Sequence, residues 1–531
     1  MADTIKLTID GKEVEVPKGT TVLQAADRMG LDVPRYCYHD GLTIAGNCRI
    51  CLVDIEKMPK LVTSCTTQAA EGMVVRTSGA KVEDGRKAVM EFLLANHPLD
   101  CPICDQAGEC RLQQYSFEHG RGGTRFAEEK IKGFKAQSIG PHIELDTERC
   151  IVCTRCVRFC DEVTKTGELG VFQRGAYSYI DVFPGTELGN AYSGNTVDIC
   201  PVGALTLKEF RFRKRVWELK DVPSTCGACA RGCNVNLGTA DEQIWRMTPR
   251  QNMDVNKWWM CDEGRLSYQP THERPRLREA LARWDGPPMA MSYPKALDFL
   301  AGRIAAAGPG GVGVIASGSL TLEDFYMLRR FASEAAKGAR VVVPENRRGE
   351  DDAILIRADK NANSAGAALM GMPVDAGGHA HEALLRDSVA GKVDVLLVLG
   401  DDLVSEGRVA QLAPARGRLF ICKIGAFESP LTAAAGLALP APAYGEFEGT
   451  WVNFQGRAQW VRRGITPRHA APETWRLLAE LMVRAGIAAH FASAAEVLSE
   501  AGQRVEALHG LTARALGTQG VELATAGAGK P

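Results

Sequence analysis

The distribution of cysteines constrains this chain more than any other feature. The sequence has 531 residues and 17 cysteines, and 16 of these lie before residue 262. The first ten residues lack the basic start and apolar run of a secretion signal, so we expect reduced thiols. Clustered thiols in a reducing compartment bind metal or carry out redox chemistry more often than they form disulfides. We therefore predict a first half organised around metal sites and an ordinary globular second half.

Charge and hydropathy argue against two classes of function. The chain has 63 basic and 64 acidic residues and a formal net charge of −1, which gives no basis for wholesale binding to nucleic acid or anionic lipid. It contains no run of about 18 apolar residues, the length that a membrane-spanning helix requires. We expect a protein on the cytosolic side without a membrane span of its own.

The first segment has the pattern of a hairpin followed by a helix. Residues 4–17 alternate apolar and polar on both sides of Asp10-Gly11, a dipeptide that accepts positive φ in a tight turn. Thr20 or Thr21 can then cap a helix. A hairpin followed by a helix is how a β-grasp domain begins.

The first cysteine set is Cys37, Cys48, Cys51 and Cys65. Gly46 opens the loop that carries the CxxC pair, and a glycine there lets the backbone approach an inorganic sulfide and donate N–H bonds to it. Four thiolates on one loop and a distant segment suit a 2Fe-2S cluster. A four-cysteine zinc site is the alternative, although zinc ribbons usually pair two CxxC knuckles and only one is present. Up to about residue 80, the chain resembles ferredoxin domains of the plant and mammalian types.

The second set is incomplete. Its three cysteines are Cys101, Cys104 and Cys110. Residues 84–96 have helical spacing, with Val89, Phe92 and Leu93 on one face, so His97 would lie at the end of a helix beside the trio. We predict His97 as the fourth ligand. Asp100, Asp105, water or a remote cysteine are the alternatives.

The third set has the CxxCxxC run of bacterial 4Fe-4S ferredoxins, closed by a remote Cys-Pro. Its members are Cys150, Cys153, Cys156 and Cys200. No second CxxCxxC run precedes Cys200, so a second ferredoxin-type cluster is not expected and Cys160 is left over. The thiol of Cys160 is either a small buried side chain or the remote cysteine that completes the second set instead of His97.

The fourth set resembles the N-terminal 4Fe-4S motif of the molybdopterin oxidoreductase family. Its members are Cys226, Cys229, Cys233 and Cys261. Zinc is again the alternative for this set taken alone.

The second half is rich in alanine and glycine and alternates apolar runs with helical patterns. We expect buried parallel strands at residues 311–316, 339–344, 393–400 and 418–423, and helices at 322–336 and 472–485. Gly400-Asp-Asp402 follows a strand and is weak support for a nucleotide phosphate site. The tail from about residue 516 is expected to fray.

The order of the four sets resembles the large iron-sulfur subunit of bacterial NADH:quinone oxidoreductase. Residues 448–459 resemble a glycine-threonine, asparagine, glycine-arginine motif of molybdopterin-type large subunits. The implied fold is α+β and multidomain. Its parts are a β-grasp 2Fe-2S domain (1–82), a helical domain with a histidine-ligated 4Fe-4S cluster (83–123), a 4Fe-4S ferredoxin-like domain (140–218), a molybdopterin-type 4Fe-4S domain (219–275) and a truncated α/β molybdopterin oxidoreductase-like domain (276–531).

The resemblance implies an electron relay rather than bond chemistry. The Cys37 set would hold the 2Fe-2S cluster, His97 with its trio the histidine-ligated 4Fe-4S cluster, and the Cys150 and Cys226 sets two more 4Fe-4S clusters. Electrons from NADH would pass from an FMN-binding partner subunit to the 2Fe-2S cluster, the Cys150 cluster and the His97 cluster, and then toward quinone. Other peripheral-arm subunits are implied partners, with the membrane arm contacted only indirectly. The implied location is the cytoplasmic face of the plasma membrane.

Departures from molybdenum-dependent relatives lead us to expect no molybdopterin. Glu263 stands where those relatives carry a lysine, and Cys422 lies in the middle of a predicted strand rather than at a metal. The alternative functions are the iron-sulfur subunit of an NAD-linked hydrogenase or of a formate dehydrogenase.

Overall fold

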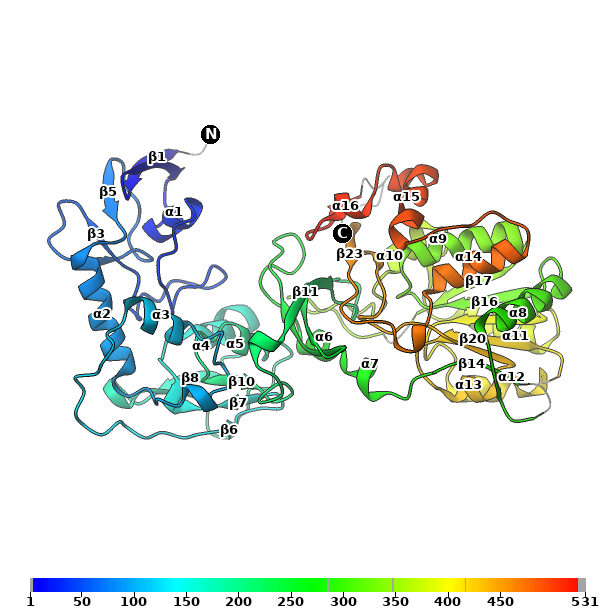
Figure 1. Cartoon of the computed structure of the whole chain (residues 1–531), viewed down its shortest axis with the longest axis horizontal. Coiled ribbons are helices and arrows are strands. Elements are labelled where there is room, and N and C mark those ends of the chain that lie inside the picture. The colour runs from blue at the N-terminus through cyan, green and yellow to red at the C-terminus, as the bar shows by residue number, and fades with distance from the viewer. Residues whose placement is uncertain (1–2, 284–285, 346–347, 416, 524–531) are drawn as a thin grey trace. The chain divides into compact units, whose positions relative to one another are not determined.

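The chain forms two compact units. The computed structural model describes residues 3–283, 286–345, 348–415 and 417–523. The units are Met1–Leu219 and Lys220–Pro531, and each is described by itself. In Figure 1 the first unit is coloured from blue to cyan-green and the second from green to red.

The first unit begins with a five-stranded sheet in the order β2-β1-β5-β3-β4. Asp10 and Gly11 both have positive φ and form the tight turn between β1 and β2, as predicted. Thr21 caps α1 with a reciprocal capping box, because its side chain accepts from Gln24 N and Gln24 bonds back to Thr21 N. The elements are β1 (Thr4–Ile9), β2 (Lys12–Pro17), α1 (Val22–Arg28), β3 (Leu52–Ile55), β4 (Val62–Thr63) and β5 (Met73–Arg76).

Two helices flank the second cysteine set. They are α2 (Ala80–Ala95) and α3 (Arg111–His119), with the 3-10 turn η1 (Cys101–Ile103) between them. The predicted apolar face of α2 is wrong in part: Phe92 is 83% exposed, while Val82, Arg86 and Met90 are buried. Arg86 tolerates burial because its guanidinium donates to the carbonyls of Leu52 and Thr77.

The rest of the first unit carries the third set. A three-stranded sheet in the order β10-β7-β6 and the β8-β9 hairpin surround short helices. The elements are β6 (Gln137–Ser138), β7 (Ile143–Leu145), η2 (Thr147–Arg149), α4 (Arg155–Phe159), the π-helix η3 (Cys160–Thr164), β8 (Leu169–Phe172), η4 (Gly175–Tyr177), β9 (Tyr179–Val182), α5 (Asn195–Asp198), β10 (Leu205–Leu207) and η5 (Val216–Glu218).

The second unit opens with an antiparallel sheet, β11-β12-β13, that carries the fourth set. Its elements are β11 (Lys220–Thr225), β12 (Asn234–Ala240), β13 (Gln243–Pro249), α6 (Asp262–Leu266) and α7 (Gln269–Glu273).

An eight-stranded sheet forms the core of the second unit, in the order β15-β14-β21-β20-β19-β16-β17-β18. The strands from β21 to β18 pair in parallel, as predicted, and β14 is antiparallel to β21 and β15. The strands are β14 (Ala280–Ala282), β15 (Met289–Met291), β16 (Val312–Ala316), β17 (Arg340–Pro344), β18 (Val374–Asp375), β19 (Val395–Leu399), β20 (Phe420–Gly425) and β21 (Leu437–Pro440).

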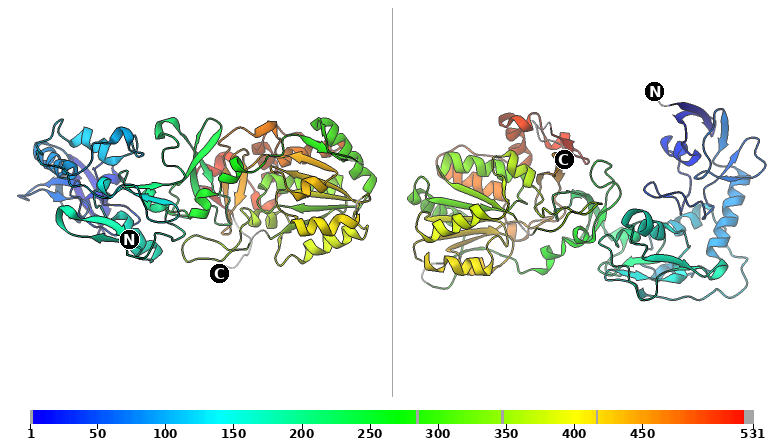
Figure 2. Two further views of the ribbon diagram at one scale, coloured as in Figure 1. Left: turned by 90° about the horizontal axis from the view of Figure 1, so that it is seen from below. Right: turned by 180° about the vertical axis from the view of Figure 1, so that it is seen from behind.

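Helices cover both faces of this sheet (Figures 1 and 2). Alternate strand residues face opposite cores: Leu397 packs in one cluster with α8, α9, α14 and α15, and Val398 packs in another with α11, α12 and α13. The helices are α8 (Tyr293–Ala307), α9 (Leu322–Arg330) with the π-helix η6 (Phe331–Ala335), α10 (Ser364–Leu369), α11 (His379–Val389), α12 (Glu406–Leu412), η7 (Ala413–Ala415), α13 (Pro430–Ala434), η8 (Arg468–Ala470), α14 (Thr474–Arg484), α15 (Ala494–Arg504), η9 (Glu506–Leu508) and α16 (Ala513–Leu516).

The C-terminal segment is better ordered than predicted. Strands β22 (Gly449–Val452), β23 (Arg457–Val461) and β24 (Val521–Glu522) form a small sheet. β24 pairs with β23, and Leu523 N donates to Gly456 O at 3.0 Å. The expected fraying from residue 516 is therefore wrong as far as residue 523, because these backbone groups have partners. The rest of the predicted tail lies outside the described residues.

Candidate metal centres

The first set lies on the loop between α1 and β3 and on the segment that follows β4. The Sγ atoms of Cys51 and Cys65 lie 3.4 Å apart, and Cys37 N lies 3.5 Å from Cys48 Sγ. All four side chains are buried. Hydrogen bonds from the thiols of Cys48 and Cys65 lower the pKa of Cys37, so the sulfur of Cys37 lies close to both. Gly46 has a φ of 66°, and a Cβ there would meet Thr66 Cγ2 at 2.7 Å, so the loop requires glycine.

The cysteines of the second set lie on η1 and at the start of α3. Burial raises the pKa of Cys104 and of Cys110. The charges of Cys104 and Cys101 raise the pKa of Cys110 further, so the three thiols lie near one another. Gly203, in the Cys-Pro loop of the third set, touches this site: a Cβ on Gly203 would lie 2.4 Å from Cys104 Sγ. Glycine therefore allows the two loops to approach each other.

His97 lies just after the end of α2, as predicted. Its Nδ1 is buried and has no hydrogen-bond partner. Burial lowers the pKa of His97 to about 4, so the imidazole is neutral at pH 7, the form that binds metal. The charges of Asp100 and Arg149 shift the pKa of both His97 and Cys104. The histidine and the three cysteines therefore lie around the same charged pair.

Cys160 does not lie with the second set. It is buried at the end of α4. There its charge raises the pKa of Cys156 of the third set, and the charges of Glu168 and Asp161 raise the pKa of Cys160. Burial raises its pKa to about 12. The thiol therefore has the setting of a small buried side chain.

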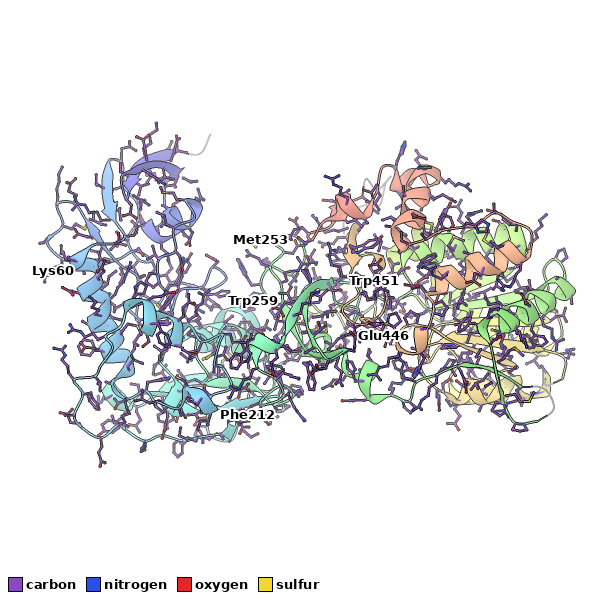
Figure 3. All side chains as sticks on the ribbon, viewed as in Figure 1. Lys60, Phe212, Met253, Trp259, Glu446 and Trp451 are labelled. Carbon is purple, nitrogen blue, oxygen red and sulfur yellow. The ribbon has the colours of Figure 1, made fainter. Side chains whose placement is uncertain are left out.

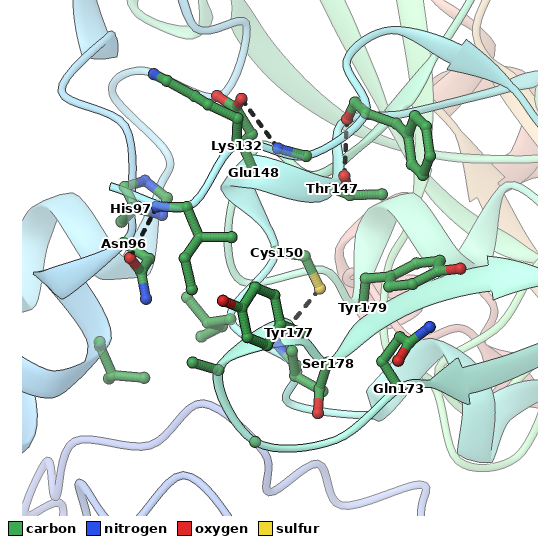
Figure 4. Close-up of a pocket in the computed structure, with 18 of the residues that line it drawn as sticks. Asn96, His97, Lys132, Thr147, Glu148, Cys150, Gln173, Tyr177, Ser178 and Tyr179 are labelled. Atoms are coloured by element: carbon green, nitrogen blue, oxygen red, sulfur yellow. Dashed lines mark hydrogen bonds between the residues drawn. The ribbon is translucent and has the colours of Figure 1, made fainter. Parts of the chain in front are cut away.

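The third set lines one cavity. All four cysteines contribute to its wall, together with Arg155, Ile180 and Leu205. Burial raises the pKa of Cys153 to about 11, so the apo thiols are protonated and binding of a metal would release protons. A second, more open pocket is lined by both His97 and Cys150 (Figure 4). The second and third sets are therefore neighbours.

The fourth set is buried in the second unit. Cys226 N donates to Cys233 O at 2.8 Å, and Cys261 caps α6 through a 3.3 Å contact from Gly264 N. A Cβ on Gly264 would lie 3.0 Å from Cys226 Sγ. Burial raises the pKa of Cys261 to about 12.

The motif at residues 448–459 supports the fourth set, a role that sequence reasoning missed. Phe454 N donates to Ala230 O at 2.9 Å, and Gln459 Nε2 donates to Gly232 O at 2.9 Å. Trp451, labelled in Figure 3, packs against Gly227, where a Cβ would meet its ring at 2.7 Å. The motif therefore fixes the loop that carries Cys229 and Cys233.

At Gly400-Asp-Asp402, the suggested phosphate site, the side chain of Asp401 is bonded to other parts of the protein. Asp401 accepts hydrogen bonds from Ala426 N at 2.9 Å and Phe427 N at 3.1 Å, and it pairs with Lys423 at 3.2 Å. Cys422 is fully buried in β20.

Among the described residues, no group of three or more His, Cys, Asp or Glu side chains is arranged to hold a single metal ion. The donor chemistry nonetheless fits iron-sulfur clusters: four groups of thiols that are buried or partly buried except at Cys101, a buried imidazole nitrogen without a partner, and glycines whose Cβ atoms would lie against cysteine sulfurs. No helix in the described ranges has both the length and the apolar composition needed to cross a bilayer.

Four family models match consecutive parts of the chain. These are the 2Fe-2S iron-sulfur cluster binding domain (residues 2–80), the NADH-ubiquinone oxidoreductase-G iron-sulfur binding region (86–125), the ferredoxin-like domain of NADH-quinone oxidoreductase subunit 3 (140–206) and the molybdopterin oxidoreductase Fe4S4 domain (219–273).

Curated relatives carry names consistent with these domains. The G subunit of NADH-quinone oxidoreductase from Rickettsia bellii is 42% identical over 327 residues, which is 62% of this chain and 48% of the relative. The protein of the same name from Streptomyces coelicolor is 40% identical over 336 residues, 63% of this chain and 40% of the relative. The mitochondrial NADH dehydrogenase (ubiquinone) iron-sulfur protein 1 of Solanum tuberosum is 45% identical over 300 residues, 56% of this chain and 40% of the relative.

This chain spans about half the length of the curated relatives it matches. Among solved structures, an NAD+-reducing NiFe-hydrogenase in the H2-reduced state matches with a TM-score of 0.37 and 29% identity, over 40% of this chain and 91% of the other. That TM-score is too low to define a shared overall fold.

Proposed function

Because this chain is a homologue of the NADH-quinone oxidoreductase G subunit and carries four iron-sulfur domains in order, we propose that it is the electron-relay subunit of such a complex. It would pass electrons from an NADH- and FMN-binding subunit toward quinone. The observation that carries the proposal is the presence of four separate groups of cysteines in one chain, in which every member except the exposed Cys101 is buried or partly buried. Other peripheral-arm subunits would be its partners, at the cytoplasmic face of the plasma membrane.

The proposed ligands follow the four sets. A 2Fe-2S cluster would be held by Cys37, Cys48, Cys51 and Cys65. Three 4Fe-4S clusters would be held by His97, Cys101, Cys104 and Cys110; by Cys150, Cys153, Cys156 and Cys200; and by Cys226, Cys229, Cys233 and Cys261. Iron-sulfur clusters supply reversible one-electron chemistry when bound, at potentials that the protein tunes.

The order of use within the first unit is supported by contacts between sets. Asn47, next to Cys48, donates from Nδ2 to Val152 O at 3.1 Å, which joins the first set to the third. Gly203 against Cys104 and the shared pocket of His97 and Cys150 join the third set to the second. The sequence of sites would therefore be Cys37 set, Cys150 set, His97 set.

The chain's own residues tune these sites. His97 contributes a neutral ligand where thiolate would add a negative charge, and this favours the reduced state. Arg149 Nη2 donates to Asp100 Oδ2 at 2.9 Å, and Lys135 lies 3.4 Å from the same carboxylate oxygen. The same two cations also pair with Asp146 and Glu148, so three carboxylates share two positive charges beside His97.

We also propose that no molybdopterin is bound. Glu263 replaces the lysine of molybdenum-dependent relatives, and its carboxylate is engaged by Lys360. Cys422 lies in the strand core rather than at a cavity. Stoichiometric molybdenum or tungsten in purified protein would contradict this proposal.

Metal analysis with EPR on the purified full chain tests the relay. About fourteen irons with equal acid-labile sulfide and a 2Fe-2S signal are expected from these cluster types. Cys153→Ser should remove about four irons, whereas Cys422→Ser, the matched change at a buried cysteine outside the sets, should remove none. A tagged chain expressed in its host should also co-purify FMN and NADH-oxidising activity. Zinc in place of iron, or iron content insensitive to Cys153→Ser, would refute the function.

A further inference from the structure

Two arginines on α4 hydrogen-bond to the backbone of both the first and the third cysteine sets. Arg155 Nη1 donates to Ile199 O at 3.0 Å, and its Nη2 donates to Tyr38 O at 2.5 Å. Ile199 immediately precedes Cys200, and Tyr38 immediately follows Cys37. One guanidinium therefore connects residues that adjoin proposed ligands of two different clusters.

Arg158 repeats this arrangement one helical turn later. Its Nη2 donates to Cys37 O at 2.5 Å and more weakly to Cys153 O at 3.4 Å. Its Nη1 donates to Thr43 O in the loop that leads to Cys48. The backbones of two proposed ligands, one from each set, thus share a single cationic group.

The carboxylate next to these arginines is that of Glu162, which accepts from Thr43 N at 2.8 Å and from Thr43 Oγ1, while Arg158 Nη1 donates to Thr43 O. Among the described residues, neither guanidinium forms an ion pair with a carboxylate, and the Nε of Arg155 is buried without a hydrogen-bond partner. Arg155 also lines the cavity formed by the third set. Because Arg155 lines this cavity and also bonds the backbone beside Cys37, the negative charge of clusters bound by the first and third sets would lie next to its guanidinium.

We propose that Arg155 and Arg158 form a cationic bridge that positions the first and third sets next to each other and stabilises electrons added to either one. The inference rests on the relay function proposed above. Guanidinium remains charged at all relevant pH values and offers several donors in a fixed plane, so it can bond two loops at once. Positive charge and hydrogen bonds beside a cluster favour its reduced form and raise its potential.

EPR-monitored redox titration of the purified full chain tests the bridge. Arg155→Met and Arg158→Met should each lower the midpoint potentials of the Cys37 and Cys150 clusters. We expect reduction to become about tenfold less favourable, or about 59 mV for a one-electron couple. Arg155→Lys, which keeps the charge, should restore most of the potential. Arg125→Met removes an exposed arginine that pairs with Glu91 and should leave both potentials unchanged.

The outcomes separate this inference from the relay itself. If the wild-type chain contains iron and sulfide but both methionine variants keep wild-type potentials, the bridge is refuted and the relay stands. If the wild-type chain contains no iron-sulfur clusters, the proposed relay function itself is refuted. If Arg155→Met prevents cluster assembly, the other two variants still test the proposal. Unchanged midpoint potentials in Arg158→Met would contradict it. Lowered midpoint potentials in Arg155→Lys would also contradict it.

Discussion

The Nζ of Lys360 lies 2.6 Å from Oε2 of Glu263, two residues beyond the last cysteine of the fourth set. Only 8% of the Lys360 side chain is exposed, so the carboxylate of Glu263, rather than water, compensates the charge of the ammonium group. Glu263→Ala should lower the free energy of unfolding by about 1–3 kcal/mol, because it leaves a buried cation unpaired. Chemical denaturation measures this. Asp298→Ala, which breaks the more exposed pair with Arg484, should cost under about 1 kcal/mol. Equal effects of the two changes would contradict the prediction.

Replacing His97 should remove one cluster. Because its Nδ1 is buried without a partner beside the trio, His97→Ala should lower iron content by about four and abolish one 4Fe-4S signal. Cys160→Ala is the control and should leave both unchanged, since Cys160 lies by Cys156 instead. If Cys160→Ala removes the signal and His97→Ala does not, the ligand assignment fails.

Gly203 should be intolerant of a methyl group. A Cβ there would lie 2.4 Å from Cys104 Sγ, so Gly203→Ala should displace that sulfur and cost about 1–3 kcal/mol. We expect loss of the His97-set EPR signal. Gly122→Ala adds the same group where nothing lies within 4 Å and should change neither signal nor stability. Normal cluster content in Gly203→Ala would show that the loops can separate without loss.

Glu323 should make the second unit less stable as pH rises. Burial raises its pKa to about 7, and it accepts hydrogen bonds from Thr450 N and Oγ1, each at 2.8 Å. Since the folded pKa exceeds the ordinary value of 4.5, this contribution to stability is complete below about pH 4.5 and is lost as pH rises through 7. The loss should reach about 3 kcal/mol.

Unfolding of wild type and Glu323→Gln between pH 5 and 8 measures this effect. The neutral amide should flatten the pH dependence without abolishing it, because burial also raises the pKa of Asp324, to about 6. Parallel curves for the two proteins would mean that Glu323 is ionised throughout.

Local patterns predicted local structure well. The Asp10-Gly11 turn, the threonine cap of α1 and the positions of the four predicted strands in the second unit follow from residues close together in sequence, and the structure has them. The prediction for Phe92 is wrong because helical spacing identifies which apolar side chains share a face, but not which of them pack against another element. The role of residues 448–459 could not be predicted, since their contacts with the Cys229 loop join segments over 200 residues apart in sequence. The neighbouring positions of His97 and Cys150 likewise depend on tertiary packing.

The fourth cysteine set is built into the second unit, whereas the other three belong to the first. Its loop is held by hydrogen bonds from Phe454 and Gln459, which lie over 200 residues further along the chain. If clusters bind as proposed, the ligands of the first three would all have been synthesised by residue 200, whereas the loop of the fourth would gain its supporting contacts only after residue 459. The four sites would then be completed in two stages.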